Sequence, residues 1–222
     1  MTTQFQIELS ELREKLLTMA SLASGSVSRA VKALVERDDV LARSVDFDDA
    51  KLDKLEIEVD EDCIQLLSKA PLANDLRLIT VAMKISHDLE RVGDEATAIA
   101  RRAIELNCEP QLKPYIDIPR MTTMALEMLT GSIEAFVGGD TARARAIIPR
   151  DKEVDGLNKQ LQRELVSFMI EDPKSISRCL NLITISKRLE RIADHAKNIA
   201  EEVVFLYEAR DIRHQSAVTR QP

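Results

Sequence analysis

The residues best suited to chemistry in this sequence are acidic side chains that occur in pairs four positions apart. Residues at that spacing lie one above the other on a helix face, where two like charges cost about 0.2–0.5 kcal/mol. Carboxylate oxygens so placed are ligands for hard cations such as Mg²⁺, Ca²⁺, Mn²⁺ or iron ions. The candidate metal ligands are Asp49 and Asp53, Glu90 and Asp94, Asp151 and Asp155, and Glu190 and Asp194.

The acid pairs recur because the chain contains one pattern twice. A shift of 100 positions places Leu89-Glu90-Arg91 on Leu189-Glu190-Arg191 and Asp94 on Asp194. A shift of 102 positions places Asp38 on Asp140, Asp49 on Asp151 and Asp53 on Asp155. The difference of two residues fits a small change in length between the second and third helices of the unit. We therefore predict a tandem duplication in which each copy carries two acid pairs.

Apolar side chains recur at alternating steps of three and four, the period of a helix with one buried face. This pattern predicts an all-α protein with six long helices, three in each copy. Few aromatic residues (3%), 6 glycines and 7 prolines argue against a many-stranded sheet. The expected helices cover about 8–36, the acid-rich stretch ending before residue 70, 75–103, 120–137, the stretch around 154–168, and 182–206. We expect Pro149 to kink or restart the fifth helix.

The clearest division of the chain is the proline-containing stretch from Cys108 to Pro119. Pro110, Pro114 and Pro119 exclude a continuous helix there. We predict one antiparallel three-helix bundle over residues 1–108 and a second over residues 109–222. Long helices at about 1.5 Å per residue make such a molecule elongated. The tail from about Asp211 mixes charged and small polar residues and is expected to fray.

The charge balance and the cysteine pattern exclude several classes of protein. Lys+Arg 31 against Asp+Glu 38 gives a formal net charge of −7, which does not suit non-specific nucleic-acid binding. The sequence contains no run of about 18 apolar residues, so we predict no membrane span. Its first residues lack the basic and apolar regions of a signal peptide, so we predict none. The three cysteines are far apart and odd in number, so they predict no disulfide framework. We expect a cytoplasmic protein.

The acid pairs are expected beside the buried faces of their helices. Glu90 and Asp94 flank the apolar positions Leu89 and Val92, and the same holds in the second copy. A cation site would then be a surface patch where the second and third helices of a unit run side by side. An alternative to a cation site is a solvent-exposed helix face whose acids are neutralised by nearby basic side chains. Such side chains are present three residues from one of the acids: Arg91, Lys187 and Lys197.

Histidine and cysteine contribute little to these predicted sites. Zinc prefers those two residue types, and they are missing at the spacings of the acid pairs. The Glu-x-x-His pair of di-iron bundles is also absent, because Lys84 and Ile192 stand three residues before His87 and His195. We interpret His195 as a bystander next to Asp194.

The doubled segments Leu89–Asp94 and Leu189–Asp194, with matching aspartates upstream, resemble the signature of the PhoU family. The resemblance covers about residues 5–208 and includes Pro71, Asp75-Leu76-Arg77 and Asn198-Ile199-Ala200-Glu201. It implies two three-helix bundles related by pseudo-symmetry. It also implies a cytoplasmic bacterial regulator that represses the phosphate-starvation response when phosphate is plentiful.

The resemblance also implies partners and cofactors. The partners are the ATPase subunit of a high-affinity phosphate ABC transporter and a sensor histidine kinase, with any peripheral membrane association made through them. We further expect a homodimer and no nucleic-acid partner. Some family members carry multinuclear clusters of iron, zinc or other metals on E(D)xxxD pairs, which correspond here to the eight acids named above. Iron, zinc, manganese and magnesium are therefore the expected cofactors.

The two copies differ beside the signature, where Asp94-Glu95-Ala96-Thr97 stands against Asp194-His195-Ala196-Lys197. Equal metal occupancy in both copies is therefore not expected. The leading hypothesis is a non-enzymatic regulatory adaptor. Two alternatives remain: a carboxylate-bridged metal enzyme, such as an oxidase or hydrolase, and a helical scaffold whose acids only keep it soluble.

Overall fold

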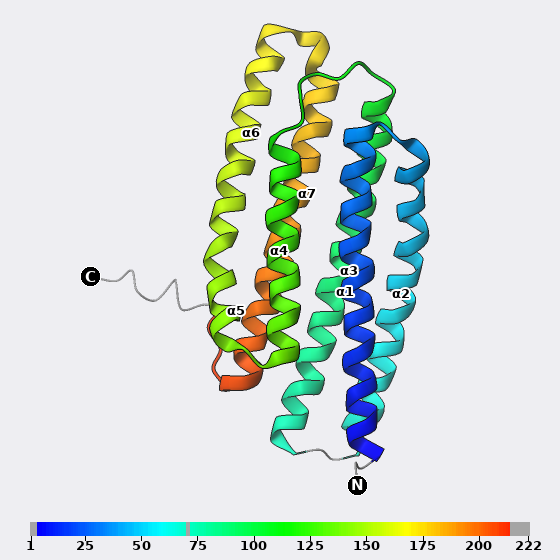
Figure 1. Cartoon of the computed structure of the whole chain (residues 1–222), viewed down its shortest axis with the longest axis vertical. Helices are drawn as coiled ribbons and strands as arrows, with labels where there is room; N and C mark the ends of the chain where they lie inside the picture. The colour runs from blue at the N-terminus through cyan, green and yellow to red at the C-terminus, as the bar shows by residue number, and fades with distance from the viewer. Residues whose placement is uncertain (1–3, 70–71, 214–222) are drawn as a thin grey trace, which may run out of the picture.

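The computed structural model describes residues 4–69 and 72–213, and the regular secondary structure within these ranges is helical throughout (Figure 1). The first repeat consists of three long helices: α1 (Gln4–Glu36), α2 (Asp39–Leu67) and α3 (Ala73–Asn107). The second repeat consists of α4 (Asp117–Gly138), the short α5 (Thr141–Ile147), α6 (Asp151–Glu171) and α7 (Ile176–Glu208), with 3₁₀ turns at Ile148–Arg150 and Pro173–Ser175. The predicted all-α duplication with six long helices is confirmed.

The two three-helix bundles lie side by side, and their helices run along the long axis of the molecule (Figure 1). Within the first bundle α1, α2 and α3 pack against one another, and in the second α7 packs against α4, α5 and α6. The bundles are joined because α3 packs against α7 and α1 against α4. Aliphatic and alanine side chains fill a continuous core through both repeats. The elongated shape expected from helix length is confirmed.

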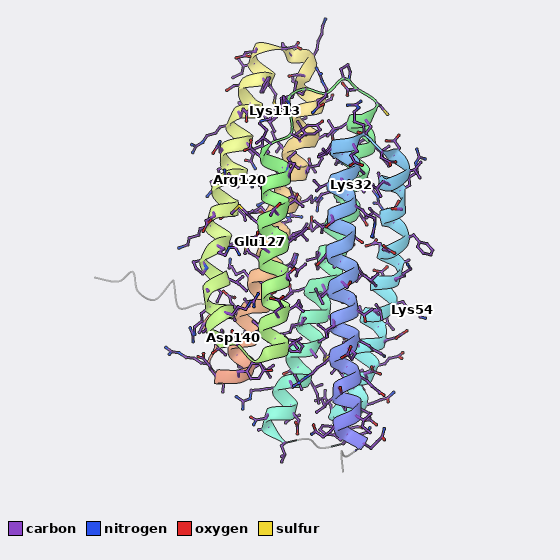
Figure 2. All side chains as sticks on the ribbon, in the orientation of Figure 1. Lys32, Lys54, Lys113, Arg120, Glu127 and Asp140 are labelled. Carbon is purple, nitrogen blue, oxygen red and sulfur yellow. The ribbon has the colours of Figure 1, made fainter. Side chains whose placement is uncertain are left out.

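The duplicated aspartates start corresponding helices in both repeats. Asp38 precedes α2, and its carboxylate accepts a hydrogen bond of 2.9 Å from the backbone N–H of Leu41. Asp140 precedes α5, and its carboxylate accepts one of 2.9 Å from the backbone N–H of Arg143. Figure 2 shows Asp140 at the end of α4, where Gly139 adopts a left-handed backbone with φ 66°. Such caps satisfy backbone donors at the helix start.

Pro149 restarts the helix of the second repeat, as predicted. The first repeat has one continuous helix, α2, whereas the corresponding segment here is divided into α5, a 3₁₀ turn and α6. A proline inside an α-helix lacks the N–H for one hydrogen bond and clashes with the preceding turn. The division leaves Asp151 as the first residue of α6.

Some helix ends differ from the expected ones by a few residues. The fourth helix begins at Asp117, ahead of the expected Arg120, because Pro119 lies in its first turn, where a missing N–H is harmless. The third helix extends to Asn107 and the last covers Ile176–Glu208. Pro71 and the tail from residue 214, which was expected to fray, lie outside the described residues. No helix in the described ranges has an apolar stretch long enough to cross a membrane.

Candidate cation sites on the acid pairs

The first repeat brings three of its four predicted ligands together between α2 and α3. The pKa of Asp49 is raised, first by burial and then by the negative charges of Asp53 and Asp94. Asp53 stands one turn along α2, and Asp94 belongs to α3. Because each ionised carboxylate makes ionisation of its neighbours harder, this cluster of Asp49, Asp53 and Asp94 favours binding of a counter-cation.

Gly93 permits the close approach of α2 and α3 at this cluster. A Cβ at position 93 would lie 2.5 Å from Leu52 Cδ1 and 3.3 Å from Asp49 Oδ1. The side chain of Leu52 is fully buried against this gap. At the matching position of the second repeat, Ala193 is fully buried, so α6 and α7 do accommodate a methyl group there. The first repeat is therefore the more tightly closed at its acid pairs.

Glu90 continues the acid strip along α3. Its pKa is raised, first by burial and then by the charge of Asp94, while Arg91 lowers it. Arg91 Nε lies 3.4 Å from Glu90 Oε2, and Arg91 Nη1 donates a 2.9 Å hydrogen bond to Asp94 Oδ2. Glu90 Oε2 is nevertheless buried without a hydrogen bond. The four predicted ligands of the first repeat thus form one strip with a single local guanidinium.

The second repeat places a lysine among its acids. Lys197 Nζ lies 2.9 Å from Asp151 Oδ2 on α6 and 3.3 Å from Asp194 Oδ1 on α7. Burial alone would lower the pKa of Lys197, but the hydrogen bond and charge of Asp151, together with Asp194, raise it overall. The ammonium group therefore occupies the position between α6 and α7 that a metal ion would need.

The remaining acid pair members of the second repeat differ in their surroundings. Glu190 Oε1 accepts a 2.7 Å hydrogen bond from Lys187 Nζ. Asp155 lies one turn along α6 from Asp151 and takes part in neither lysine contact. Glu190 and Asp151 are buried, 9% and 7% exposed, although a surface patch was expected. The lysines that pair with these carboxylates also cover them, since the stems of such side chains are apolar.

The donor set of the first repeat fits a hard cation better than that of the second. Buried carboxylate oxygens without a hydrogen bond occur in both repeats, at Glu90 in the first and at Asp151 and Glu190 in the second. The first repeat differs in its cations, because Arg91 is the one paired with Glu90 and Asp94. In the second repeat Lys187 and Lys197 already neutralise three of the four acids. The unequal donor sets agree with the sequence difference between Thr97 and Lys197.

Beside the first-repeat strip lie Glu56, which the sequence interpretation missed, and His87, which it did not count among the ligands. Glu56 on α2 and His87 on α3 approach to 3.2 Å between Glu56 Oε1 and His87 Nδ1. His87 stands three residues before Glu90, so the two share a helix face. The Glu-x-x-His order is absent at His87, but the reverse order, His87-x-x-Glu90, is present.

Comparison with known proteins agrees with this architecture. The family model described as "PhoU domain" matches twice, over residues 16–103 and 118–203. A Pseudomonas putida protein named phosphate-specific transport system accessory protein PhoU homolog is 43% identical over 214 residues, 95% of this chain and 83% of the relative. An Aquifex aeolicus protein of the same name is 41% identical over 209 residues, 94% of this chain and 95% of the relative.

Solved structures show the same arrangement of helices. The crystal structure of PhoU from Pseudomonas aeruginosa matches with a TM-score of 0.91 and 41% identity, covering 93% of this chain and all of that one. The phosphate transport system regulatory protein PhoU from Streptococcus pneumoniae matches with a TM-score of 0.88 and 29% identity, covering 94% and 99%. Two domain matches and relatives above 40% identity along nearly the whole sequence show that the chain belongs to the PhoU family.

Proposed function

We propose that the protein is a non-enzymatic cytoplasmic regulator of phosphate uptake. It couples the ATPase subunit of a high-affinity phosphate ABC transporter to a sensor histidine kinase, and it represses the phosphate-starvation response when phosphate is plentiful. The observation that carries this proposal is the double match to the PhoU domain, with relatives named as accessory proteins of phosphate-specific transport. We place the division between the two domains after residue 108 and expect a homodimer.

In this proposal the acid pairs are cation sites that hold the surface of the bundle in one geometry. The strip of Asp49, Asp53, Glu90 and Asp94 would hold a hard cation such as Mg²⁺, Mn²⁺ or an iron ion between α2 and α3. Such an ion supplies positive charge between carboxylates whose pKa values are raised by burial and mutual repulsion. The matching residues Asp151, Asp155, Glu190 and Asp194 form the corresponding site, where Lys197 competes with the ion.

The regulatory proposal is tested by binding and by repression in cells. The full chain should retain the transporter ATPase subunit and the sensor kinase in separate pull-downs. Deleting its gene should switch on a phosphate-starvation reporter in phosphate-rich medium, and the wild-type gene should restore repression. A deletion strain that keeps the reporter off, together with failure to retain either partner, would contradict the proposal.

The cation role has its own test. Protein purified without chelator is analysed for bound metal and titrated with several cations, beside a variant in which all eight paired acids become Asn or Gln. We expect the wild type to bind metal and the variant to lose both metal and repression. Absence of binding under all the cations, with unchanged repression by the variant, would refute this role and leave the adaptor role standing.

A further inference from the structure

Four large apolar side chains are exposed along one line on the outer face of α2. They are, with their exposed fractions, Val40 (81%), Phe47 (70%), Ile57 (60%) and Ile64 (63%). Their steps of seven, ten and seven residues keep them on one side of the helix, because seven residues complete nearly two turns. Single exposed apolar residues are normal on a protein, but an ordered line of them is typical of an interaction surface.

The line fits the seam of a heptad repeat, in which positions a and d face a neighbouring helix. With Val40 at position a, Phe47 is also at a, whereas Ile57 and Ile64 are at d. Figure 2 shows Lys54, another a position, on the side of α2 that faces away from the other helices. We call the eight a and d positions the outer seam of α2; besides the apolar four they are Arg43, Ala50, Lys54 and Glu61.

A row of aspartates runs beside the outer seam. The first four g positions of α2, which flank the seam, are Asp39, Asp46, Asp53 and Asp60. Within the described residues, one of these four carboxylates is in an ion pair, since Asp46 Oδ1 lies 3.5 Å from Arg101 Nη2. That pair is exposed, and exposed pairs contribute little. The row is therefore available to the charges of another molecule.

The charge of α2 indicates which molecule the outer seam suits. The helix carries ten acidic and three basic side chains, a formal −7 that equals the net charge of the whole chain. A second copy of the chain would bring the same acidic helix against it, and an anionic lipid surface would also be repelled. A basic helix instead gains attraction to the aspartates and buries the apolar line.

The second repeat lacks this surface. The residues 102 positions after the four aspartates are Thr141, Ile148, Asp155 and Gln162. Those that match the exposed apolar line are Ala142, Pro149, Lys159 and Val166. The three-helix unit therefore folds without the aspartate row and without the apolar line, so the fold of the unit does not explain them.

We propose that the outer seam of α2 is a docking surface for an amphipathic helix of a partner protein, with lysines or arginines beside its apolar stripe. Arg43, Lys54 and Glu61 make the seam more polar than a permanent interface, so the contact is reversible. It would be one partner contact of the adaptor, so its use in the cell rests on the proposed function. Its affinity for a basic helix does not.

A synthetic helix of this chemistry is the probe. It has four heptads with Leu at positions a and d and Lys at e and g, and it carries a fluorescent label. The control peptide has the same composition in an order that forms no apolar face. The full chain is titrated into each peptide, and anisotropy reports binding. We expect the probe to bind at least tenfold more tightly than the control peptide; equal binding of the two would overturn the proposal.

Variants of the outer seam locate the binding. Phe47→Ser with Ile57→Ser should weaken probe binding at least tenfold, because a few apolar anchors dominate such contacts. Val166→Ser with Ile170→Ser is the matched control, since both side chains are exposed apolar residues of α6, and it should bind the probe as the wild type does. Circular dichroism checks that both variants are folded. Equal weakening by the two variants would place the binding elsewhere and contradict the proposal.

Asp46→Asn with Asp60→Asn tests the charge of the partner. This variant should bind the probe at least threefold more weakly in low salt, and the difference should vanish at about 0.5 M salt, where exposed charges are screened. Unchanged binding in low salt would overturn the basic character of the occupant. Sedimentation tests a second copy as the occupant: the wild type and the Phe47→Ser, Ile57→Ser variant should have the same mass, and a lower mass of the variant would refute docking of a partner.

Repression in cells separates the docking surface from the proposed function. In the deletion strain, the wild-type gene and the α6 control should restore repression, whereas Phe47→Ser with Ile57→Ser should leave the starvation reporter on. If the seam variant also restores repression, docking on α2 is overturned and the regulatory function stands. If the deletion strain keeps the reporter off, the regulatory function fails, and the peptide titrations still decide whether α2 binds a basic helix.

Discussion

His195 Nδ1 lies 2.8 Å from Asp88 Oδ1, which links α7 of the second repeat to α3 of the first. The same contact occurs once more with the charges exchanged, because Arg188 Nη1 donates a 3.0 Å hydrogen bond to Glu95 Oε2. The two pairs correspond in the duplication: Asp88 matches Arg188, and Glu95 matches His195, each 100 positions apart. The pseudo-symmetric joint between the repeats therefore places an acid opposite a basic residue at both ends, and His195 acts in the joint between the bundles.

Breaking the joint at Glu95 should destabilise the protein strongly. The Glu95 side chain is 8% exposed and is paired with Arg188 and with Arg191, at 3.0 and 3.4 Å. Changing both arginines to Met leaves a buried carboxylate without a partner, which should lower the free energy of unfolding by roughly 3 kcal/mol. Urea unfolding measures the loss. Adding Glu95→Gln should recover most of it, because the buried charge is then gone.

The matched control is an exposed pair. Arg102 bonds to Glu105 at 2.8 Å on the surface of α3, and Arg102→Met should cost less than about 1 kcal/mol. If the triple variant with Glu95→Gln is as unstable as the double arginine variant, the loss comes from arginine packing and not from the unpaired charge.

Gly93 should be intolerant of even one added carbon. In Gly93→Ala the new Cβ meets Leu52, so α2 and α3 must separate, at a cost of about 1–3 kcal/mol. The separation also moves Asp49 away from Asp94, so cation affinity should fall. Gly156→Ala in α6 is the control: no atom lies within 4 Å of its added Cβ, and it should stabilise by up to about 1 kcal/mol. Thermal unfolding with and without MnCl₂ distinguishes the outcomes, and equal stability of the two variants would contradict the close approach.

The features that sequence could predict are those set by local chemistry or by helical period. Asp38 and Asp140 begin helices because an aspartate accepts from backbone N–H groups within its own turn. Pro149 breaks its helix for an equally local reason. The gathering of Asp49 and Asp94 also follows from helical period and the packing of neighbouring helices.

The features that sequence missed depend on which side chains meet across helices. The contact of Glu56 with His87 needs the register of α2 against α3, which no spacing along one helix defines. Helical spacing places Lys197 near Asp194, but its contact with Asp151 on α6 depends on the distance between two helices. The burial of Glu190 beneath Lys187 likewise depends on the path of a long side chain.

The first-repeat aspartates should make stability depend on pH. The raised pKa of Asp49 means that the folded chain holds its proton more tightly than the unfolded chain. The corresponding stability is present below the ordinary aspartate pKa and is lost as pH rises through the raised value. Asp49→Asn should therefore stabilise the metal-free protein by about 0.4–1 kcal/mol at neutral pH, because the burial cost of the charged carboxylate and its repulsion by Asp53 and Asp94 disappear.

Urea unfolding of wild type and Asp49→Asn across pH measures this difference. The gain should shrink as pH falls towards the ordinary aspartate pKa, and it should also shrink in high salt, since the cluster is partly exposed. Glu61→Gln, at an exposed position of α2, should change stability by less than about 0.5 kcal/mol. A gain for Asp49→Asn that stays constant across pH would contradict burial and repulsion of the charged carboxylate as its causes.

Lys197 should be replaceable by a metal ion. Lys197→Met leaves the Asp151 side chain, 10% exposed, without its ammonium partner and should cost about 2–3 kcal/mol in metal-free buffer. The freed carboxylates of Asp151 and Asp194 then resemble the first-repeat cluster. Added MnCl₂ should recover much of the loss, since a ligand at one hundred times its Kd stabilises by about 2.7 kcal/mol.

A background without the first-repeat cluster isolates this effect. With Asp49, Asp53 and Asp94 all changed to Asn, manganese should leave the melting temperature nearly unchanged while Lys197 is present, and should raise it once Lys197 is Met. Lys152→Met, at an exposed position of α6, should show no new manganese response. A cation already bound between Asp151 and Asp194 must weaken the binding of a second cation there, because like charges repel. An equal manganese response with and without Lys197 would therefore mean that its ammonium group does not occupy the metal site.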